Sequence, residues 1–312
     1  MDDAQPSDTE VNVIQREHID SSQRQQPAVI VPDTDIGKIM AVVNKMEHTK
    51  PLLVTLINNA YLPFTYSWLC NTKNMDVHKR VLIITTDQES KDALNKLWPD
   101  IQVVVIAGMP LKGDQVYSHA GYVRLMIRRT QILLEMLQNN IEIFLFEVDC
   151  LWLRNPVPDL SRVVNYDILV NPVSERPGII AGGFLYMFPT DATKSLWNEL
   201  NNKLLQLDAK IKSLPAASGI SEGENDQMYI SGLVSKKFAG VKAKTLPLEE
   251  YADGKWYTFP EKKRQALNPY VINNNWALGN QNKISRAKEW NHWFIKEDNS
   301  CDLEKVGQIV KS

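Results

Sequence analysis

The chain has 312 residues, and its 35 Lys and Arg nearly balance its 37 Asp and Glu, which gives a formal net charge of −2. This balance argues against a nucleic-acid partner, because nucleic-acid-binding domains normally carry a basic surplus. A composition of 44% hydrophobic and 23% charged residues is ordinary for a globular protein with a sizeable core. No apolar run approaches the roughly 18 residues that a membrane span needs.

The N-terminal residues and the cysteines indicate in which cellular compartment the protein is expected. The chain starts Met-Asp-Asp, without the basic and apolar regions of a signal peptide. Its cysteines are Cys70, Cys150 and Cys301, and it has no Asn-x-Ser/Thr sequon. An odd and sparse set of cysteines does not indicate a disulfide framework and fits a reducing compartment. We therefore expect a cytosolic protein, with the Golgi lumen as the alternative if an N-terminal anchor precedes this sequence.

Polarity and hydrophobic spacing divide the chain into an N-terminal tail and a folded region. Residues 1–28 are rich in Gln, Asp and Ser and are predicted to be disordered. Residues 29–50 are predicted to form a helix and linker, with helical spacing over 33–47. In chain order we then expect strands over 52–57, 81–85, 101–106 and 141–146, and helices over 61–70, 88–98 and 122–138.

The second half has a looser pattern. We expect strands over 167–170 and 183–188, a helix over 192–208 and a polar loop around 218–225. Gly182 and Gly183 would precede the second of these strands, where they form either a simple turn or a close approach to a ligand. Strands that alternate with helices predict an α/β domain with a mainly parallel sheet, and ligands of such sheets bind at the carboxyl ends of the strands.

The sharpest chemical signal is the pair Glu147 and Asp149, which follows the apolar run 141–146. In extended backbone, residues i and i+2 face the same side. Two carboxylates on one side at a strand end favour a hard divalent cation, Mn²⁺ or Mg²⁺, which could hold a diphosphate. The alternative is a strand end with two solvated acids.

The surroundings of this pair resemble those in the nucleotide-diphospho-sugar transferase family, which includes plant arabinosyl- and xylosyltransferases and cytosolic galactosyltransferases. The hallmark is a hydrophobic strand, an acid-x-acid motif and a Trp-hydrophobic-Arg-Asn/Asp-Pro tail. Further matches occur in family order over residues 51–296. The matching segments are Val54–Asn58, Leu125–Leu133, Trp152–Pro156, Ala181–Tyr186, Asn225–Gln227 and Val271–Trp276, followed by Gly279 and Lys283.

The resemblance implies the glycosyltransferase A fold, an α/β architecture with a Rossmann-like, mainly parallel central sheet flanked by helices and a mixed C-terminal acceptor-side half. It implies one catalytic domain over residues 51–312, with a nucleotide-binding half (51–156) and a donor-sugar and acceptor half (157–296). The implied reaction moves galactose, xylose or arabinose from a UDP-sugar to a hydroxyl group of a glycan, glycoprotein or polysaccharide, with retention of the anomeric configuration.

The resemblance also assigns roles to residues. Glu147 and Asp149 would bind Mn²⁺ or Mg²⁺, and Asp226 and Gln227 would lie beside the donor sugar as catalytic residues. The donor would be bound by Thr55, Asn58, one of the paired arginines Arg128 and Arg129, Gly182, Gly183 and Lys283. Because no second carboxylate is obviously placed as a nucleophile, we favour front-face attack guided by the leaving diphosphate.

Each assignment has a structural alternative. Asn225 or Asp226 could simply cap a helix, Asn58 could be a turn residue, and Lys283 could be an ordinary surface lysine. The arginines could lie on a solvated helix face, and Trp152 and Trp276 are expected in the core.

Two departures from the family pattern motivate a rival interpretation. Glu147 stands where the family usually has Asp, and the run Asn273–Asn275 stands where many relatives have a His. A non-catalytic module that binds a nucleotide sugar or a partner is therefore the alternative function. A nucleotidyltransferase is a third possibility, although the segment after the first strand, residues 56–60, lacks the expected glycines.

Overall fold

The computed structural model describes residues 34–47, 51–106 and 113–310. The predicted disorder of residues 1–28 lies outside the described residues, as do residues 29–33 of the predicted linker. The predicted N-terminal helix is present as α1 (Asp35–Val43), capped by the Thr34 side chain.

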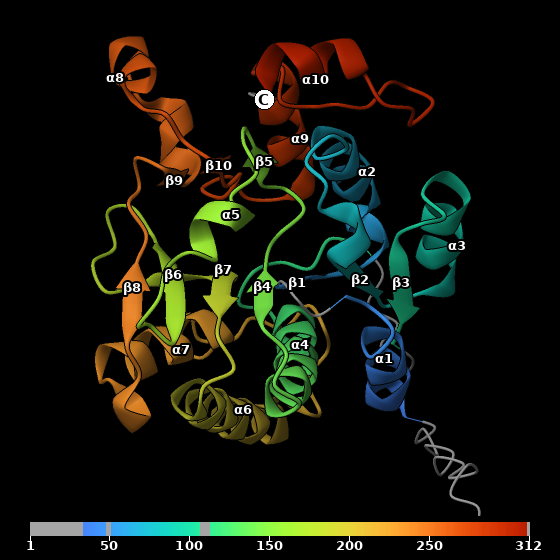
Figure 1. Ribbon diagram of the computed structural model, residues 1–312. Helices are drawn as coiled ribbons and strands as arrows, with labels where there is room; N and C mark the ends of the chain where they lie inside the picture. The colour runs from blue at the N-terminus through green and yellow to red at the C-terminus, as the bar shows by residue number, and fades with distance from the viewer. Residues whose placement is uncertain (1–33, 48–50, 107–112, 311–312) are drawn as a thin grey trace, which may run out of the picture.

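Within the described residues, a seven-stranded sheet forms the centre of the molecule, with strand order β3-β2-β1-β4-β7-β6-β8 (Figure 1). A smaller sheet has the order β5-β10-β9. The strands are β1 (Leu52–Ile57), β2 (Val81–Thr85), β3 (Gln102–Val105), β4 (Ile143–Leu145), β5 (Leu151–Trp152), β6 (Ile168–Pro172), β7 (Ile180–Met187), β8 (Ala243–Thr245), β9 (Tyr251–Ala252) and β10 (Val271–Ile272).

The central sheet is mainly parallel, as the alternation of strands and helices predicts. Strands β1 to β4 pair in parallel, and so do β6 and β8. Strand β7 is antiparallel to both of its neighbours, β4 and β6. Strands from both predicted halves of the catalytic domain therefore share one sheet, and β1, β4 and β6 end at the same edge.

Helices cover both faces of this sheet because its central strands are apolar on both sides. Leu52 and Val54 of β1 belong to the cluster that packs against α1, α4, α6 and α7, whereas Leu53 belongs to the cluster on the α2 and C-terminal side. The α-helices are α2 (Leu62–Asn71), α3 (Gln88–Leu97), α4 (Ala120–Gln138), α5 (Val157–Leu160), α6 (Asp191–Ile211), α7 (Asp226–Ser235), α8 (Glu261–Ala266), α9 (Asn280–Glu289) and α10 (Leu303–Ile309). The 3₁₀ helices are η1 (Asn59–Tyr61), η2 (His78–Arg80), η3 (Phe238–Gly240) and η4 (Gly254–Thr258). In the described part of the chain, no helix combines the length and apolarity needed to cross a membrane.

Two sequence expectations are wrong in their local detail. Gly182 and Gly183 lie inside β7 rather than before it, since β7 already begins at Ile180 and pairs with β6 there. Trp152 is fully buried as predicted, but Trp276 is 43% exposed and is not a core residue.

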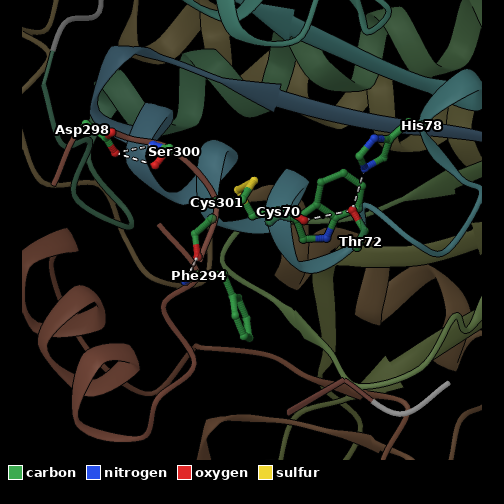
Figure 2. The surroundings of a disulfide bond; sticks show 9 residues. Cys70, Thr72, His78, Phe294, Asp298, Ser300 and Cys301 are labelled. Carbon is green, nitrogen blue, oxygen red and sulfur yellow. Dashed lines mark hydrogen bonds between the residues drawn. A yellow bond between two sulfur atoms is a disulfide. The ribbon is translucent and has the colours of Figure 1, made fainter. Parts of the chain in front are cut away.

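The cysteine expectation is also wrong. Cys70 of α2 and Cys301 form a disulfide across a sequence separation of 231 residues (Figure 2). Cys150 is a buried free cysteine. The bond fastens the C-terminal segment to α2, where the backbone N–H of Phe294 also donates to the Ser67 hydroxyl at 3.0 Å. Because the two cysteines come together only in the folded chain, their spacing in the sequence carries no sign of the pair.

Candidate active site

The acid pair lies immediately beyond the carboxyl end of β4, at the edge of the sheet where β1 also ends. The chain turns there, because the Cys150 N–H donates to the Glu147 carbonyl at 3.1 Å. Asp149 is 8% exposed, and one of its carboxylate oxygens, Oδ2, lies 2.7 Å from Nζ of Lys283 in α9. Lys283 is thus an ion-pair partner of the motif and not an ordinary surface lysine.

Electrostatics couple the two acids to Lys283. Burial, reinforced by the charge of Asp149 and opposed by Lys283, raises the pKa of Glu147 above its usual range. Burial works against the charge of Lys283, but the attraction of Asp149 prevails and raises its pKa. The site thus holds a permanent ammonium charge against two carboxylates.

A divalent cation fits the oxygen atoms that the chain presents here. Oδ1 of Asp149 and Oδ1 of Asn273 are buried without a hydrogen-bond partner, and Nδ2 of Asn273 lies 3.4 Å from Oε2 of Glu147. Buried unpaired oxygens are costly unless something binds them, and a carboxylate–amide set of oxygens is hard enough for Mn²⁺ or Mg²⁺. Among the described residues no group of three or more His, Cys, Asp and Glu forms a metal cluster, so Asn273 would have to serve beside the two acids.

A second ion pair lies beside the first. Arg129 of α4 donates to Oδ2 of Asp226 at 2.7 Å and to the Gly182 carbonyl at 2.9 Å, and both charged side chains are largely buried. Burial raises the pKa of Asp226, and the Arg129 guanidinium opposes the rise. Asn225 caps α7 by accepting from the Met228 N–H, which leaves Asp226 free to face Arg129.

The structure shows which of the two neighbouring arginines contacts Asp226, a distinction that the sequence alone does not make. Arg128 donates to Gln131 at 3.1 Å and lies 3.4 Å from Asp35 of α1, outside the site. Successive helical residues are offset by about 100°, so only Arg129 can face Asp226. Of the two arginines, the structure therefore brings Arg129 to Asp226 and places Arg128 beside Asp35.

The glycines of β7 make room for both carboxylates. A Cβ on Gly183 would overlap the carboxylate of Glu147, and a Cβ on Gly182 would approach Oδ2 of Asp226 to 3.0 Å and Gln227 to 3.3 Å. Since adjacent strand residues face opposite sides, the glycine pair brings β7 close to both acids at once. In this structure the two glycines lie close to the side chains of Glu147 and Asp226, and their predicted approach to a donor sugar stays a prediction.

A pocket opens beside these charges. It has a volume of about 70 Å³ and is bounded by the end of β1 and the start of α4, and both Glu147 and Arg129 line its wall. Its polar lining residues are Thr55, Asn58, Tyr61, Gln115, Tyr122, Arg129 and Glu147. The Asn58 side chain also donates to the Gly113 carbonyl at 2.7 Å, which ties the end of β1 to the segment before α4. Burial, opposed by Lys283 and reinforced by Asp149, raises the pKa of Tyr61 to about 12, so this residue is a neutral hydroxyl donor.

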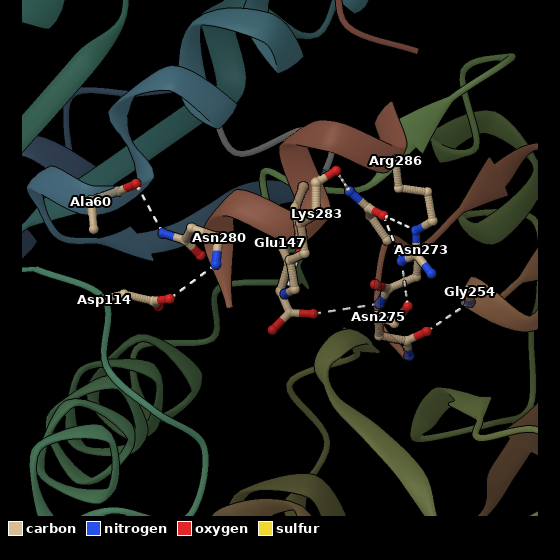
Figure 3. A network of polar contacts seen from close by, with 11 residues as sticks. Ala60, Asp114, Glu147, Gly254, Asn273, Asn275, Asn280, Lys283 and Arg286 are labelled. Atoms are coloured by element: carbon tan, nitrogen blue, oxygen red, sulfur yellow. Dashed lines mark hydrogen bonds and ion pairs between the residues drawn. The ribbon is translucent and has the colours of Figure 1, made fainter. Parts of the chain in front are cut away.

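Helix α9 closes the other side of the site (Figure 3). Its first residue, Asn280, donates to the Ala60 carbonyl at 3.0 Å through its side chain and to Asp114 at 2.9 Å through its backbone. Arg286 donates to Oδ1 of Asn274 at 2.8 Å and so positions the segment that follows β10. Sequence reasoning did not assign a role to Arg286, although its i,i+3 spacing from Lys283 places both on one helix face.

The chain is similar in sequence to known glycosyltransferases. Residues 76–287 match the family described as nucleotide-diphospho-sugar transferase. An Arabidopsis thaliana UDP-D-xylose:L-fucose alpha-1,3-D-xylosyltransferase 3 is 21% identical over 89% of this chain and 75% of its own length. The Arabidopsis arabinosyltransferase XEG113 is 22% identical over 76% of this chain and 39% of its own.

Solved glycosyltransferases are similar at lower identity. A galactosyltransferase in complex with donor and acceptor sugar analogues is 7% identical with a TM-score of 0.49, and the match covers 83% of this chain and 96% of that one. Mouse xyloside xylosyltransferase 1 is 11% identical with a TM-score of 0.43, over 72% of this chain and 98% of that one. The family match covers more than half of the residues and includes the acid motif, the arginine pair, both glycines and Lys283. The chain therefore belongs to the nucleotide-diphospho-sugar transferase family and is a nucleotide-sugar-dependent glycosyltransferase.

Proposed function

We propose that this chain transfers a sugar from a UDP-sugar to a hydroxyl group of a glycan, glycoprotein or polysaccharide, with retention of the anomeric configuration and with help from Mn²⁺ or Mg²⁺. Galactose, xylose and arabinose are the candidate sugars, and the names of the Arabidopsis relatives put UDP-xylose first among the donors to test. The observation that carries the proposal is the convergence of the two ion pairs, Lys283–Asp149 and Arg129–Asp226, beside the pocket at the end of β1.

The two ion pairs would contact different parts of the donor, Lys283–Asp149 the diphosphate and Arg129–Asp226 the sugar. The nucleoside would occupy the pocket beside Thr55 and Asn58, with the diphosphate directed toward Asp149 and Lys283. The Lys283 ammonium would stabilise negative charge on the leaving diphosphate, because it is a fixed cation in a largely buried site. A divalent cation held by Glu147, Asp149 and Asn273 would add Lewis-acid stabilisation of the same charge.

Asp226 and Gln227 would face the donor sugar. Arg129 fixes one oxygen of Asp226, and the other, Oδ1, is buried without a hydrogen-bond partner. That oxygen is suited to accept hydrogen bonds from sugar hydroxyls. The ion pair with Arg129 lowers the nucleophilicity of the carboxylate, which supports front-face attack over a covalent intermediate on Asp226.

The proposal is tested by UDP release from purified protein. UDP-xylose, UDP-galactose, UDP-arabinose and UDP-glucose are each incubated with and without Mn²⁺, with Asp149→Asn as the inactive variant. We expect release from one donor, dependent on Mn²⁺ and lost in the variant, and NMR of the product should show the retained anomer. Absence of release from every donor, together with absence of Mn²⁺ binding, would instead support the non-catalytic binding module. A glycosyl group trapped on Asp226 would contradict front-face attack.

The disulfide bears on the compartment. The expectation of a cytosolic protein depended partly on the sparse cysteines, and the Cys70–Cys301 disulfide removes that part of its support. Because disulfides persist in oxidising compartments, we propose that the chain works in a secretory lumen. Mass spectrometry of alkylated, unreduced protein from its natural source should recover Cys70 and Cys301 as a linked peptide, whereas two free thiols would favour the cytosol.

A further inference from the structure

Trp276 is unusual for a large aromatic residue near a buried site. It is 43% exposed, and its backbone has a φ of +57°, in the left-handed region that residues with a Cβ rarely occupy. Backbone strain of this kind persists only where the surrounding structure imposes it, and it gathers at functional sites. The contacts around Trp276 show what imposes it.

The three residues before Trp276 are anchored to the site (Figure 3). Asn273 contacts Glu147 at 3.4 Å, Asn274 donates to the Lys283 carbonyl at 3.0 Å, and Asn275 accepts from the Gly254 N–H at 2.7 Å. Because three residues of chain span at most about 11 Å, Trp276 emerges close to the acid motif.

The indole ring itself is held from two sides. Its Nε1–H donates to Oδ2 of Asp253 at 2.7 Å, and the Lys255 ammonium lies 4.4 Å from the ring centroid. Asp253 is buried, accepts from Ser174 at 2.8 Å, and so does not depend on Trp276 alone. The Lys255 ammonium lies over one face of the ring, and the residue as a whole is 43% exposed to solvent.

Two of the residues that hold this ring also line a cavity. Asp253 and Lys255 line a cavity of about 290 Å³ together with Trp256, Phe259 and Glu249. It lies on the β9 and α8 side, away from the pocket at the end of β1. Its mixture of aromatic side chains and hydrogen-bonding groups suits a ligand that has apolar faces and polar edges.

We propose that Trp276 is the platform on which the acceptor sugar stacks, and that the cavity lined by Asp253 and Lys255 binds the next part of an acceptor glycan. A pyranose ring has an apolar C–H face and a rim of hydroxyls, which matches an indole face bordered by Asp253 and Lys255. The donor pocket is bounded by β1 and α4, so the acceptor must enter from another side, and Trp276 is the exposed aromatic beside Asn273. This inference rests on the proposed glycosyl transfer and extends it to the acceptor subsite.

The test compares donor hydrolysis with transfer. Wild type, Trp276→Ala, Trp276→Phe and Tyr166→Ala are assayed for UDP release with the donor alone and with methyl glycosides of L-fucose, D-galactose and D-xylose as acceptor probes. Tyr166, which precedes β6 at the opposite edge of the sheet, is a matched control because it is 40% exposed. We expect Trp276→Ala to raise the KM for the acceptor probe about 10-fold. Trp276→Phe should raise this KM by a smaller factor, and Tyr166→Ala should leave it unchanged. Donor hydrolysis and the KM for the UDP-sugar should stay unchanged.

Several results would overturn the inference. An unchanged acceptor KM in Trp276→Ala would show that the ring does not bind the acceptor. Equal loss of hydrolysis and transfer in both Trp276 variants, with the melting temperature retained, would place Trp276 at the donor instead. A further outcome is that wild type releases UDP from the donor alone while no acceptor probe increases the rate at any soluble concentration. That result would show that Trp276 does not bind a simple neutral sugar as acceptor. Absence of UDP release from wild type would overturn the proposed function, and this inference would fall with it.

Discussion

The Lys283 ammonium lies 2.7 Å from Oδ2 of Asp149, a residue 134 positions earlier in the chain. The Asp149 side chain is 2% exposed and that of Lys283 is 17% exposed, so the pair is largely shielded from water. Through this contact, α9 supplies a fixed cation to the acid motif at the end of β4.

Replacing the ammonium tests its role. Lys283→Met should lower kcat about 100-fold, because a fixed charge at the leaving group acts mainly in the transition state. It should also destabilise the fold by about 3–5 kcal/mol, because Asp149 stays buried without its partner. Steady-state kinetics and denaturant unfolding measure the two effects. Lys203→Met is the matched control, since Lys203 pairs with Glu199 on the surface of α6; equal effects in both variants would show that the Asp149 contact is unimportant.

The two arginines of α4 provide an internal comparison. Arg129→Met should abolish measurable transfer and cost about 3–5 kcal/mol of stability, because it leaves Asp226 buried and unpaired. Arg128→Met should change stability by less than about 1 kcal/mol, because Arg128 and Asp35 form a partly exposed pair. UDP-release assays measure the activity of both variants, and urea unfolding measures their stability. A greater loss of activity in Arg128→Met would contradict the placement of Arg129 as the site residue.

The lack of a side chain at Gly183 can be tested with one methyl group. Gly183→Ala should lower kcat about 10-fold or more, because the new Cβ would displace the Glu147 carboxylate. Gly232→Ala in α7 is the control, since a Cβ there meets no atom within 4 Å. The control should retain activity and gain about 1 kcal/mol of stability from the higher helix propensity of alanine. Full activity of Gly183→Ala would show that Glu147 need not lie against β7.

The raised pKa of Glu147 predicts how stability depends on pH. The folded state binds the proton more tightly than the unfolded chain, so this residue stabilises the fold at acidic pH, and the effect is lost as pH rises through the raised pKa. Glu147→Gln should therefore have a higher melting temperature than wild type at pH 7 without metal, and the difference should shrink as pH falls. Glu199→Gln, a surface variant in α6, should show no such trend. If Glu147→Gln melts at the same temperature as wild type at pH 7, burial of the charged Glu147 carboxylate does not destabilise the fold.

The disulfide should contribute to stability because it closes a very long loop. Reduction, or the variant Cys301→Ala, should cost about 2–5 kcal/mol, and the variant should no longer respond to reductant. Thermal unfolding with and without dithiothreitol measures the effect. Wild type that melts at the same temperature in both conditions would show that the bond does not constrain the C-terminal segment.

Local patterns predicted several elements well. The predicted strands over 52–57 and 81–85 match β1 and β2, because short apolar runs between polar turns are typical of buried strands. The apolar run 141–146 likewise predicts a strand just before the acid pair, and β4 ends at Leu145. By contrast, the pattern predicts a strand from 183, whereas β7 begins at Ile180, since Gly182 and Gly183 have low strand propensity and are held there by pairing with neighbouring strands.

The sequence by itself determined the α/β class, the central strands and the position of Glu147 and Asp149 directly after an apolar run. These features depend on residues close together in the chain, whose spacing and hydrophobicity act locally. Only the tertiary structure decided that Arg129 rather than Arg128 meets Asp226, that Cys70 bonds to Cys301, and that Trp276 is exposed. Each of these depends on segments separated by many residues, and their contacts arise only when burial of the core fixes the orientation of each helix against the sheet.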